Sequence, residues 1–207
     1  MIDWAKLVAE RAQSSGVLLI PELARELNLS EHVVRKALVR QEHRGIVEHL
    51  GNKIFWNRLA EGFGERDLFR YFRPNAYLSL ASVLRDSGIS TQTPVSLTCV
   101  TTEHKGRIDS KSLSITFHHI SPKLFWGFHE KRTLYGSYKV AEPEKAILDW
   151  IYLARQRGLP AATDEFDVSQ IDRGKLLDYA AKYPKPVRQQ ITELLADFAA
   201  GRAGSLT

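Results

Sequence analysis

The sequence predicts an α+β protein built from two domains, joined near residue 60. Three observations lead to this prediction. Residues 1–60 combine helical spacing of apolar residues with short apolar runs. Residues 74–207 mix β-branched, strand-like runs with further helical patterns. Between them, residues 61–73 contain Gly62 and Gly64 among mixed charges, which is typical of a linker.

The composition is that of a cytoplasmic globular protein. Hydrophobic residues make up 43% of the 207 positions, enough for an ordinary core. The one cysteine, Cys99, excludes an internal disulfide framework and fits a reducing compartment. The N-terminus lacks a signal-peptide pattern, and no apolar run approaches the roughly 20 residues of a membrane span. We therefore expect a cytoplasmic protein without a membrane partner.

The first domain is expected to begin with three helices. Apolar residues at helical spacing predict a helix over residues 2–14, followed by a short strand over 17–20. Pro21 suits the start of a second helix, although Ile20 stands where a Thr or Ser cap would be expected. Ser30 is a good N-cap for a third helix, which Gly45 ends.

The third helix has one apolar side and one basic side. Two strands, over residues 46–50 and 53–57, follow it around a Gly51-Asn52 turn. Three helices and a hairpin in this order predict a winged helix-turn-helix over residues 1–60, whose third helix enters the DNA major groove. The apolar side of that helix carries Val34, Ala37, Leu38 and Gln41, and the other side carries His32, Arg35, Lys36, Val39 and His43, with Arg40 beside them.

Double-stranded DNA is therefore the predicted partner of the first domain. Arg35 and Arg40 suit guanine edges or bidentate phosphate contacts. An alternative is that the domain contacts a protein and that these side chains form an ordinary solvated face. The full set of predicted DNA-binding residues is Ser30, His32, Arg35, Lys36, Arg40, Arg44 and Lys53, of which Lys36, Arg44 and Lys53 suit phosphates and His32 a base or a phosphate.

The second domain, residues 74–207, is expected to hold a small sheet followed by helices. Residues 67–72 suit either a short helix or an extended arm. Asn75 is expected to cap a helix that carries Tyr77, Leu80, Ala81 and Leu84 on one face and ends at Gly88. Strands are expected over residues 95–101, 113–120, 125–128 and 134–140, a polar loop over 103–111, and helices from 143, over 172–183 and from 186.

The stretch from Tyr138 to Ala154 is expected to run from a strand directly into a buried helix. Pro143 suits the first helical position, and Glu142 and Glu144 place negative charge at the positive end of the helix dipole. Asp149 interrupts an otherwise apolar run. A buried carboxylate needs a partner, so we expect helix capping and a buried pairing, for example with a nearby arginine, and not a catalytic role.

No catalytic, metal or cofactor site is predicted. His118 and His119 are adjacent on an expected strand and point to opposite faces, so they do not share an ion easily. His104, His129 and Cys99 lack ligand spacing, and Cys99 is expected to be an inert core residue. Neither a nucleophile elbow nor a phosphate-binding glycine loop is present in the sequence.

The middle of the chain is its most basic part. Residues 65–140 carry eleven Lys and Arg against six Asp and Glu. One interpretation is a surface for an acidic partner or nucleic acid, and the other is an ordinary solvated surface. The residues of this predicted basic surface are Lys105, Arg107, Lys111, Lys123, Lys131 and Arg132.

Four segments of the second domain resemble the AbiEi family, the antitoxins of AbiE-type toxin–antitoxin and phage abortive-infection systems. The most specific is AEPEKA at residues 141–146, followed by Leu148-Asp149. The others, in family order, are residues 74–88, 95–102 and 117–120. The resemblance implies an N-terminal domain that binds inverted repeats upstream of its own operon. It also implies a second domain that counteracts a co-encoded nucleotidyltransferase toxin, with or without a stable complex.

Three hypotheses about function remain open at this level. The first is an antitoxin that is also a DNA-binding transcriptional autorepressor. The second is a stand-alone winged-helix regulator whose second domain senses a ligand or dimerises. The third, an enzyme with a DNA-binding appendage, ranks last because the sequence offers no catalytic constellation.

Overall fold

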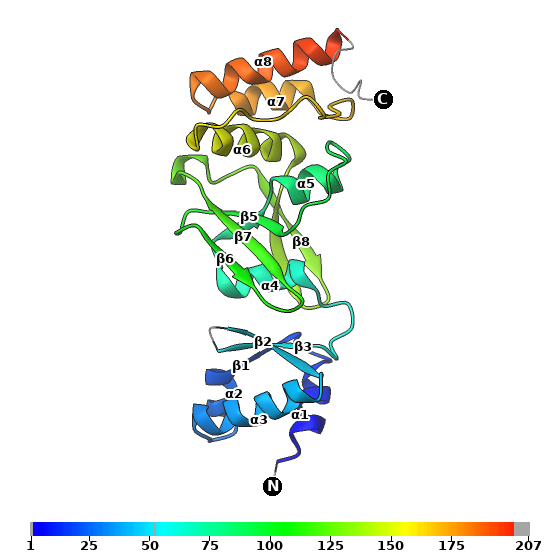
Figure 1. Ribbon diagram of the computed structural model, residues 1–207, viewed down its shortest axis with the longest axis vertical. Coiled ribbons are helices and arrows are strands. Elements are labelled where there is room, and N and C mark those ends of the chain that lie inside the picture. Colours follow the sequence, from blue (N-terminus) through cyan, green and yellow to red (C-terminus); the bar gives the residue numbers. More distant parts are fainter. Residues whose placement is uncertain (1, 52, 201–207) are drawn as a thin grey trace. The chain divides into compact units, whose positions relative to one another are not determined.

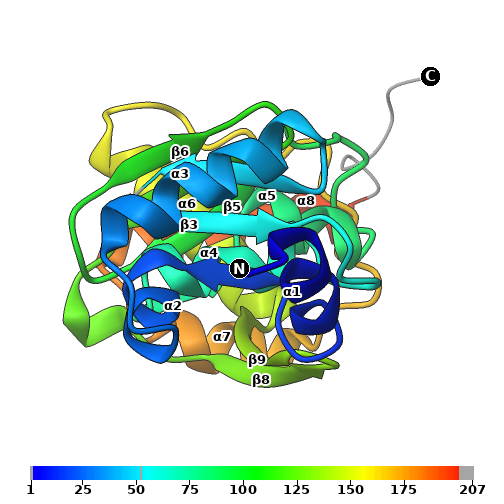
Figure 2. The same ribbon diagram turned by 90° about the horizontal axis from the view of Figure 1, so that it is seen from below.

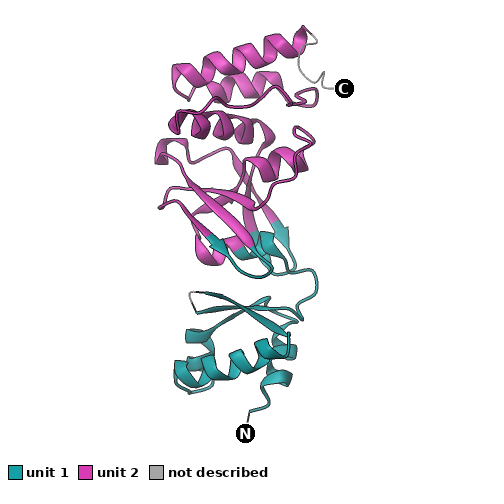
Figure 3. Cartoon of the chain, viewed as in Figure 1, with its two compact units in different colours: residues 1–68, 108–113, 132–137 teal, residues 69–107, 114–131, 138–207 magenta. Residues whose placement is uncertain are grey.

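The computed structural model describes residues 2–51 and 53–200. It divides into two compact units, each treated separately below (Figure 3). Unit 1 comprises residues 1–68, 108–113 and 132–137, and unit 2 comprises residues 69–107, 114–131 and 138–207. The predicted α+β class is confirmed, because the described residues form both helices and strands and much of the strand pairing is antiparallel. Among the described residues, no helix combines the length and apolar character needed to cross a membrane.

Unit 1 packs its helices on one face of an antiparallel sheet of order β1-β3-β2 (Figure 1). Leu18 pairs with Phe55 and Glu48 with Trp56 in this sheet. Val8, Leu38 and Phe55 are fully buried in the core between them. The elements are α1 (Trp4–Arg11), β1 (Val17–Leu19), α2 (Ile20–Glu26), α3 (Glu31–His43), β2 (Val47–Gly51) and β3 (Ile54–Asn57).

The helix starts in unit 1 follow their local sequence. Ser30 caps α3, since its Oγ accepts a hydrogen bond from the Val33 amide at 3.4 Å. Ile20, which precedes Pro21, has no hydroxyl group to cap a helix, and α2 accordingly begins without a side-chain cap. The expected Gly51-Asn52 turn includes Asn52, which lies outside the described residues. Gly51 and Lys53 on either side of it have positive φ angles of 83° and 63°.

Unit 2 is organised on a sheet of order β6-β7-β5-β4-β9-β8. Strand β4 is antiparallel to β5 and parallel to β9, and β5 is parallel to β7. Helices α6, α7 and α8 pack on one another at one end of the unit (Figure 1). The elements from residue 65 onward are α4 (Glu65–Phe72), β4 (Ala76–Leu78), α5 (Ala81–Asp86), β5 (Leu97–Thr101), β6 (Gly106–Asp109), β7 (Ser114–His119), the 3-10 turn η1 (Pro122–Leu124), β8 (Phe128–Thr133), β9 (Gly136–Ala141), α6 (Pro143–Gln156), α7 (Arg173–Ala180) and α8 (Lys185–Ala199).

The helix expected from Asn75 to Gly88 is wrong over its first half. Residues 76–78 form the strand β4, and the helix α5 begins only at Ala81. All three residues of β4 are buried, and the strand lies inside the sheet between β5 and β9. A strand buried on both faces shows an apolar run without alternation, and such a run resembles a helix face in sequence.

Two other expectations in unit 2 are corrected. The polar loop expected over residues 103–111 contains the edge strand β6, whose residues alternate between half-buried and exposed. An edge strand of this kind has little apolar signal to detect. The strand expected over residues 125–128 instead begins at Phe128, after the 3-10 turn η1.

The expected linker contains the helix α4, the first of the two alternatives for residues 67–72. Leu68 and Phe69 are both fully buried, and the division between the two units falls between them. A single linear boundary also does not describe unit 1, because it includes residues 108–113 and 132–137.

A buried polar cluster occupies the start of α6. The buried pairing expected for Asp149 is present, and its partner is Lys145, four residues earlier on the same helix, rather than an arginine. The Lys145 ammonium also donates to the hydroxyls of Tyr77 (2.9 Å) and Tyr183 (2.8 Å). Those two hydroxyls and that of Ser79 donate in turn to the Asp149 carboxylate, at 2.8, 2.9 and 3.0 Å. Every proton of the ammonium is therefore satisfied inside the core.

The cluster is closed to solvent. Lys145 and Asp149 are both fully buried. Burial lowers the pKa of Lys145, and the Asp149 carboxylate opposes that change. Burial and the same carboxylate raise the pKa of Tyr77 and Tyr183, so both phenols stay protonated and donate. We interpret the cluster as structural: it connects α6 to β4 and to Tyr183, which follows α7.

Candidate nucleic-acid interface

Helix α3 packs one side into the core of unit 1 and exposes its basic side to solvent. Val34, Ala37, Leu38 and Gln41 are buried as predicted. Residues three and four apart lie on one helix face, so this spacing turns the intervening residues outward. The outward residues of α3 and its C-terminal end include His32, Arg35, Lys36, Arg40 and Arg44, all of them exposed.

The charges of this face are not neutralised by any ion pair among residues 2–51 and 53–200. Arg35, Lys36, Arg40 and Arg44 have no ion pair with any residue that the structure describes. Figure 2 looks onto the helices of unit 1, with α3 among the elements nearest the viewer. An exposed helix with unpaired guanidinium and ammonium groups suits phosphate oxygens and guanine edges.

Two predicted residues are engaged inside unit 1. The hydroxyl of Ser30 caps α3, as described above. The Lys53 ammonium forms an ion pair of 2.6 Å with Glu31, the first residue of α3. Both side chains are about half exposed, so the pair contributes little to stability. The pair nevertheless ties the hairpin to the start of α3, and Glu31 was not among the predicted residues.

Arg58 is an exposed basic residue of unit 1 that was not among the predicted DNA-binding residues. It follows β3 directly, and its guanidinium lies 4.0 Å from the centre of the Trp56 ring. Its Nη1 lies 3.9 Å from a carboxylate oxygen of Glu48. Both contacts place Arg58 beside Trp56 and Glu48, which are paired across β3 and β2.

The residues of the predicted basic surface lie on several separate elements of the structure. Lys105 and Arg107 lie beside and within β6, at one edge of the unit 2 sheet. Lys131 lies in β8, at the opposite edge. Lys123 belongs to η1, whereas Lys111 and Arg132 belong to segments of unit 1. The sheet order therefore separates Lys105 and Arg107 at the β6 edge from Lys131 and Arg132 at the β8 edge.

The histidines have partners of other kinds. His119 is exposed, and its Nδ1 lies 2.9 Å from the carbonyl oxygen of Glu103. His118 is half-buried and accepts a hydrogen bond at Nδ1 from the Arg157 guanidinium. Within residues 2–51 and 53–200, no three His, Cys, Asp or Glu side chains are grouped to hold a metal ion. Cys99 is fully buried, which raises the pKa of its thiol.

His118 gives a testable dependence of stability on pH. Burial, with the Arg157 cation beside it, lowers its pKa from 6.5 to about 4. Between these two values the unfolded chain takes up a proton that the folded chain does not. The stability from the neutral imidazole is therefore complete above pH 6.5 and falls as the pH drops toward 4. Discounted for partial exposure, the loss at pH 5 is about 1 kcal/mol.

The measurement is urea unfolding at pH 7 and pH 5 for the native protein and His118→Gln. Glutamine accepts the hydrogen bond from Arg157 but does not titrate. The stability difference between the two proteins should therefore shift by about 1 kcal/mol between these pH values, in favour of the variant at pH 5. A His118 NMR titration midpoint near 6.5 would contradict the expectation.

Comparisons with known proteins add no assignment. No protein-family model matches the chain, and a search of curated proteins gives no match.

Proposed function

We propose that the protein is an AbiEi-like antitoxin and a DNA-binding transcriptional autorepressor of a toxin–antitoxin operon. It acts in the cytoplasm, is not an enzyme, and counteracts a co-encoded nucleotidyltransferase toxin. The observation that carries the DNA-binding half is the exposed, unpaired basic side of α3. The order α1-β1-α2-α3-β2-β3, with sheet order β1-β3-β2, supports a winged helix-turn-helix.

The arrangement suits a helix lying in the major groove. Arg35 and Arg40 are five residues apart on the exposed side of the 13-residue helix α3. Guanidinium groups suit bidentate contacts with guanine O6 and N7 or with phosphates. Lys36 and Arg44 suit phosphates, which set the position of the protein without distinguishing sequence. The Lys53 ammonium is paired with Glu31, so a contact between Lys53 and a phosphate competes with that ion pair.

The antitoxin half of the proposal is supported by the resemblance of the four segments of unit 2. Of these, residues 141–149 lie at the start of α6 and include both charges of the buried cluster. A substitution there would damage the fold and a specific function together, so the two halves of the proposal need separate tests.

The first test measures binding of the full-length protein to its own upstream DNA and to a scrambled duplex across a salt series. Preferential binding to the upstream DNA, weakening steeply with salt, is expected. Each phosphate contact contributes about −0.9 to the slope of log K against log salt concentration. Equal binding to both duplexes would contradict a repressor.

The second test co-expresses the protein with a neighbouring nucleotidyltransferase reading frame. Growth arrest by that reading frame alone, relieved by the full-length protein, is the expected result. Relief should persist in a variant that lacks Arg35 and Arg40, because antagonism is assigned to unit 2. A toxin that remains active in the presence of the native protein would contradict the antitoxin half alone.

A further inference from the structure

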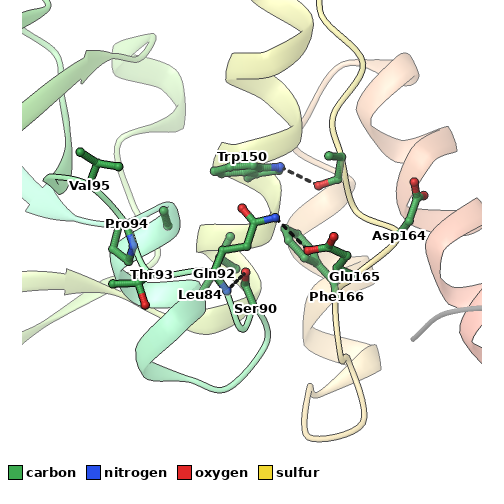
Figure 4. Close-up of a pocket in the computed structure, with 12 residues that line it drawn as sticks. Leu84, Ser90, Gln92, Thr93, Pro94, Val95, Trp150, Asp164, Glu165 and Phe166 are labelled. Carbon is green, nitrogen blue, oxygen red and sulfur yellow. Dashed lines mark hydrogen bonds between the residues drawn. The ribbon is translucent and has the colours of Figure 1, made fainter. Parts of the chain in front are cut away.

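Unit 2 contains two pockets that meet at Trp150 of α6. The first, here called the basic pocket, has a volume of about 260 Å³, and its lining includes Leu80, His118, Trp150, Leu153, Arg157 and Leu159. The second, here called the acidic pocket, has a volume of about 360 Å³, and its lining includes Ser90, Gln92, Trp150, Asp164, Glu165 and Phe166 (Figure 4). Trp150 and Ala162 line both pockets.

The chain segment after α6 is fixed where it forms the wall of the basic pocket. The Trp150 indole N–H donates to the carbonyl oxygen of Ala162 at 3.1 Å. The side-chain amide of Gln190, on α8, donates to the carbonyl oxygen of Ala161 at 3.0 Å. Two helices thus hold this segment by its backbone, so the pocket is largely pre-formed.

The basic pocket is apolar apart from one end. Among its described lining residues, Arg157 is the one with a formal charge at neutral pH. His118 stays uncharged there, because burial and the adjacent guanidinium lower its pKa to about 4. A guanidinium carries five N–H donors, and Arg157 donates one of them to His118 Nδ1. This hydrogen bond orients the group at the polar end of the pocket.

We propose that the basic pocket binds a small organic carboxylate with an apolar body. The carboxylate pairs with the Arg157 guanidinium, and the apolar part packs against Trp150 and Leu153. Charge complementarity selects this occupant, since Arg157 supplies one positive charge and the remaining lining is predominantly apolar. Asp164 and Glu165 in the acidic pocket repel the carboxylate and so favour the Arg157 end. The volume of the basic pocket, about 260 Å³, suits a small free molecule as its occupant.

The test titrates the full-length protein with 4-phenylbutyrate and, separately, with its uncharged amide, by calorimetry. Saturable binding of one carboxylate per chain is expected, with a dissociation constant of about 1 mM or lower. The amide should bind at least about tenfold more weakly, because it lacks the charge-assisted hydrogen bonds. The Trp150 indole N–H resonance should shift during the carboxylate titration.

Substitutions distinguish binding in the basic pocket from a general attraction of the carboxylate to positive charge on the protein. Arg157→Met keeps an apolar stem and removes the charge, so the preference for the carboxylate over the amide should disappear. Arg157→Lys should retain the preference. Arg188→Met is the matched control, because Arg188 is exposed on α8 and does not line the basic pocket.

Three results would overturn the proposal: no saturable binding of 4-phenylbutyrate up to about 10 mM, equal binding of the carboxylate and the amide, or the same loss of preference in Arg188→Met as in Arg157→Met. The site does not depend on DNA binding, so these results leave the proposed function untouched. Conversely, a failed operator experiment leaves this binding site standing.

Discussion

Asp149→Ala is expected to lower the free energy of unfolding of unit 2 by about 3–5 kcal/mol. The substitution leaves the Lys145 ammonium fully buried without its counter-ion. It also removes the acceptor for the hydroxyls of Tyr77, Ser79 and Tyr183. An uncompensated buried charge costs far more than the pair itself contributes, since desolvation offsets most of the attraction. Urea unfolding of the full chain at pH 7 measures the change.

Two further variants test the cause of this loss. Asp149→Ala combined with Lys145→Met removes both charges and should recover part of the stability, because an apolar side chain of similar length fills the Lys145 site. Glu193→Ala, on the exposed side of α8, should change stability by less than about 0.5 kcal/mol. A double variant no more stable than Asp149→Ala would show that the stranded lysine charge is not the cause.

Arg35→Ala with Arg40→Ala is expected to weaken binding to the upstream DNA by at least about 30-fold. Each arginine that contacts a base or phosphate contributes about 1–3 kcal/mol, and both side chains are exposed on α3. The salt dependence should become shallower as well, by about 0.9 in slope for each phosphate that the variant no longer neutralises. Fluorescence anisotropy with labelled duplex measures both quantities.

The matched control for this variant is Arg155→Ala with Arg188→Ala, which removes the same charge from exposed positions of α6 and α8. It should bind the DNA as the native protein does at a given salt concentration. Unfolding free energies of both double variants should stay within about 1 kcal/mol of the native value, because all four residues are exposed. Unchanged operator binding in the α3 variant would show that another element contacts the bases.

Some of the structure follows from local patterns in the sequence. The buried side of α3 was predicted because Val34, Ala37, Leu38 and Gln41 repeat at the helical period, and Ser30 marks where that helix begins. The run from β9 into α6 was predicted from Pro143 and the apolar residues after it. These features depend on neighbours within one or two helical turns, so a short window of sequence contains the information.

The buried pair shows a local signal that was present and missed. Lys145 and Asp149 are four residues apart, which places them on one face of α6. The sequence does not show that both are buried, because their burial depends on Tyr77 and Tyr183. These two residues lie 68 and 38 positions away from Lys145 in the chain.

Other features were decided by tertiary structure alone. Residues 76–78 form a strand because β5 and β9 lie on either side of them, and an apolar run without those neighbours equally suits a helix. Sheet order separated the lysines and arginines of the predicted basic surface, which share only a stretch of sequence. The basic pocket exists because Trp150 and Gln190 hold a distant segment by its backbone. Contacts between segments that are separated in the sequence determine each of these three features. The local spacing of apolar residues does not indicate such contacts.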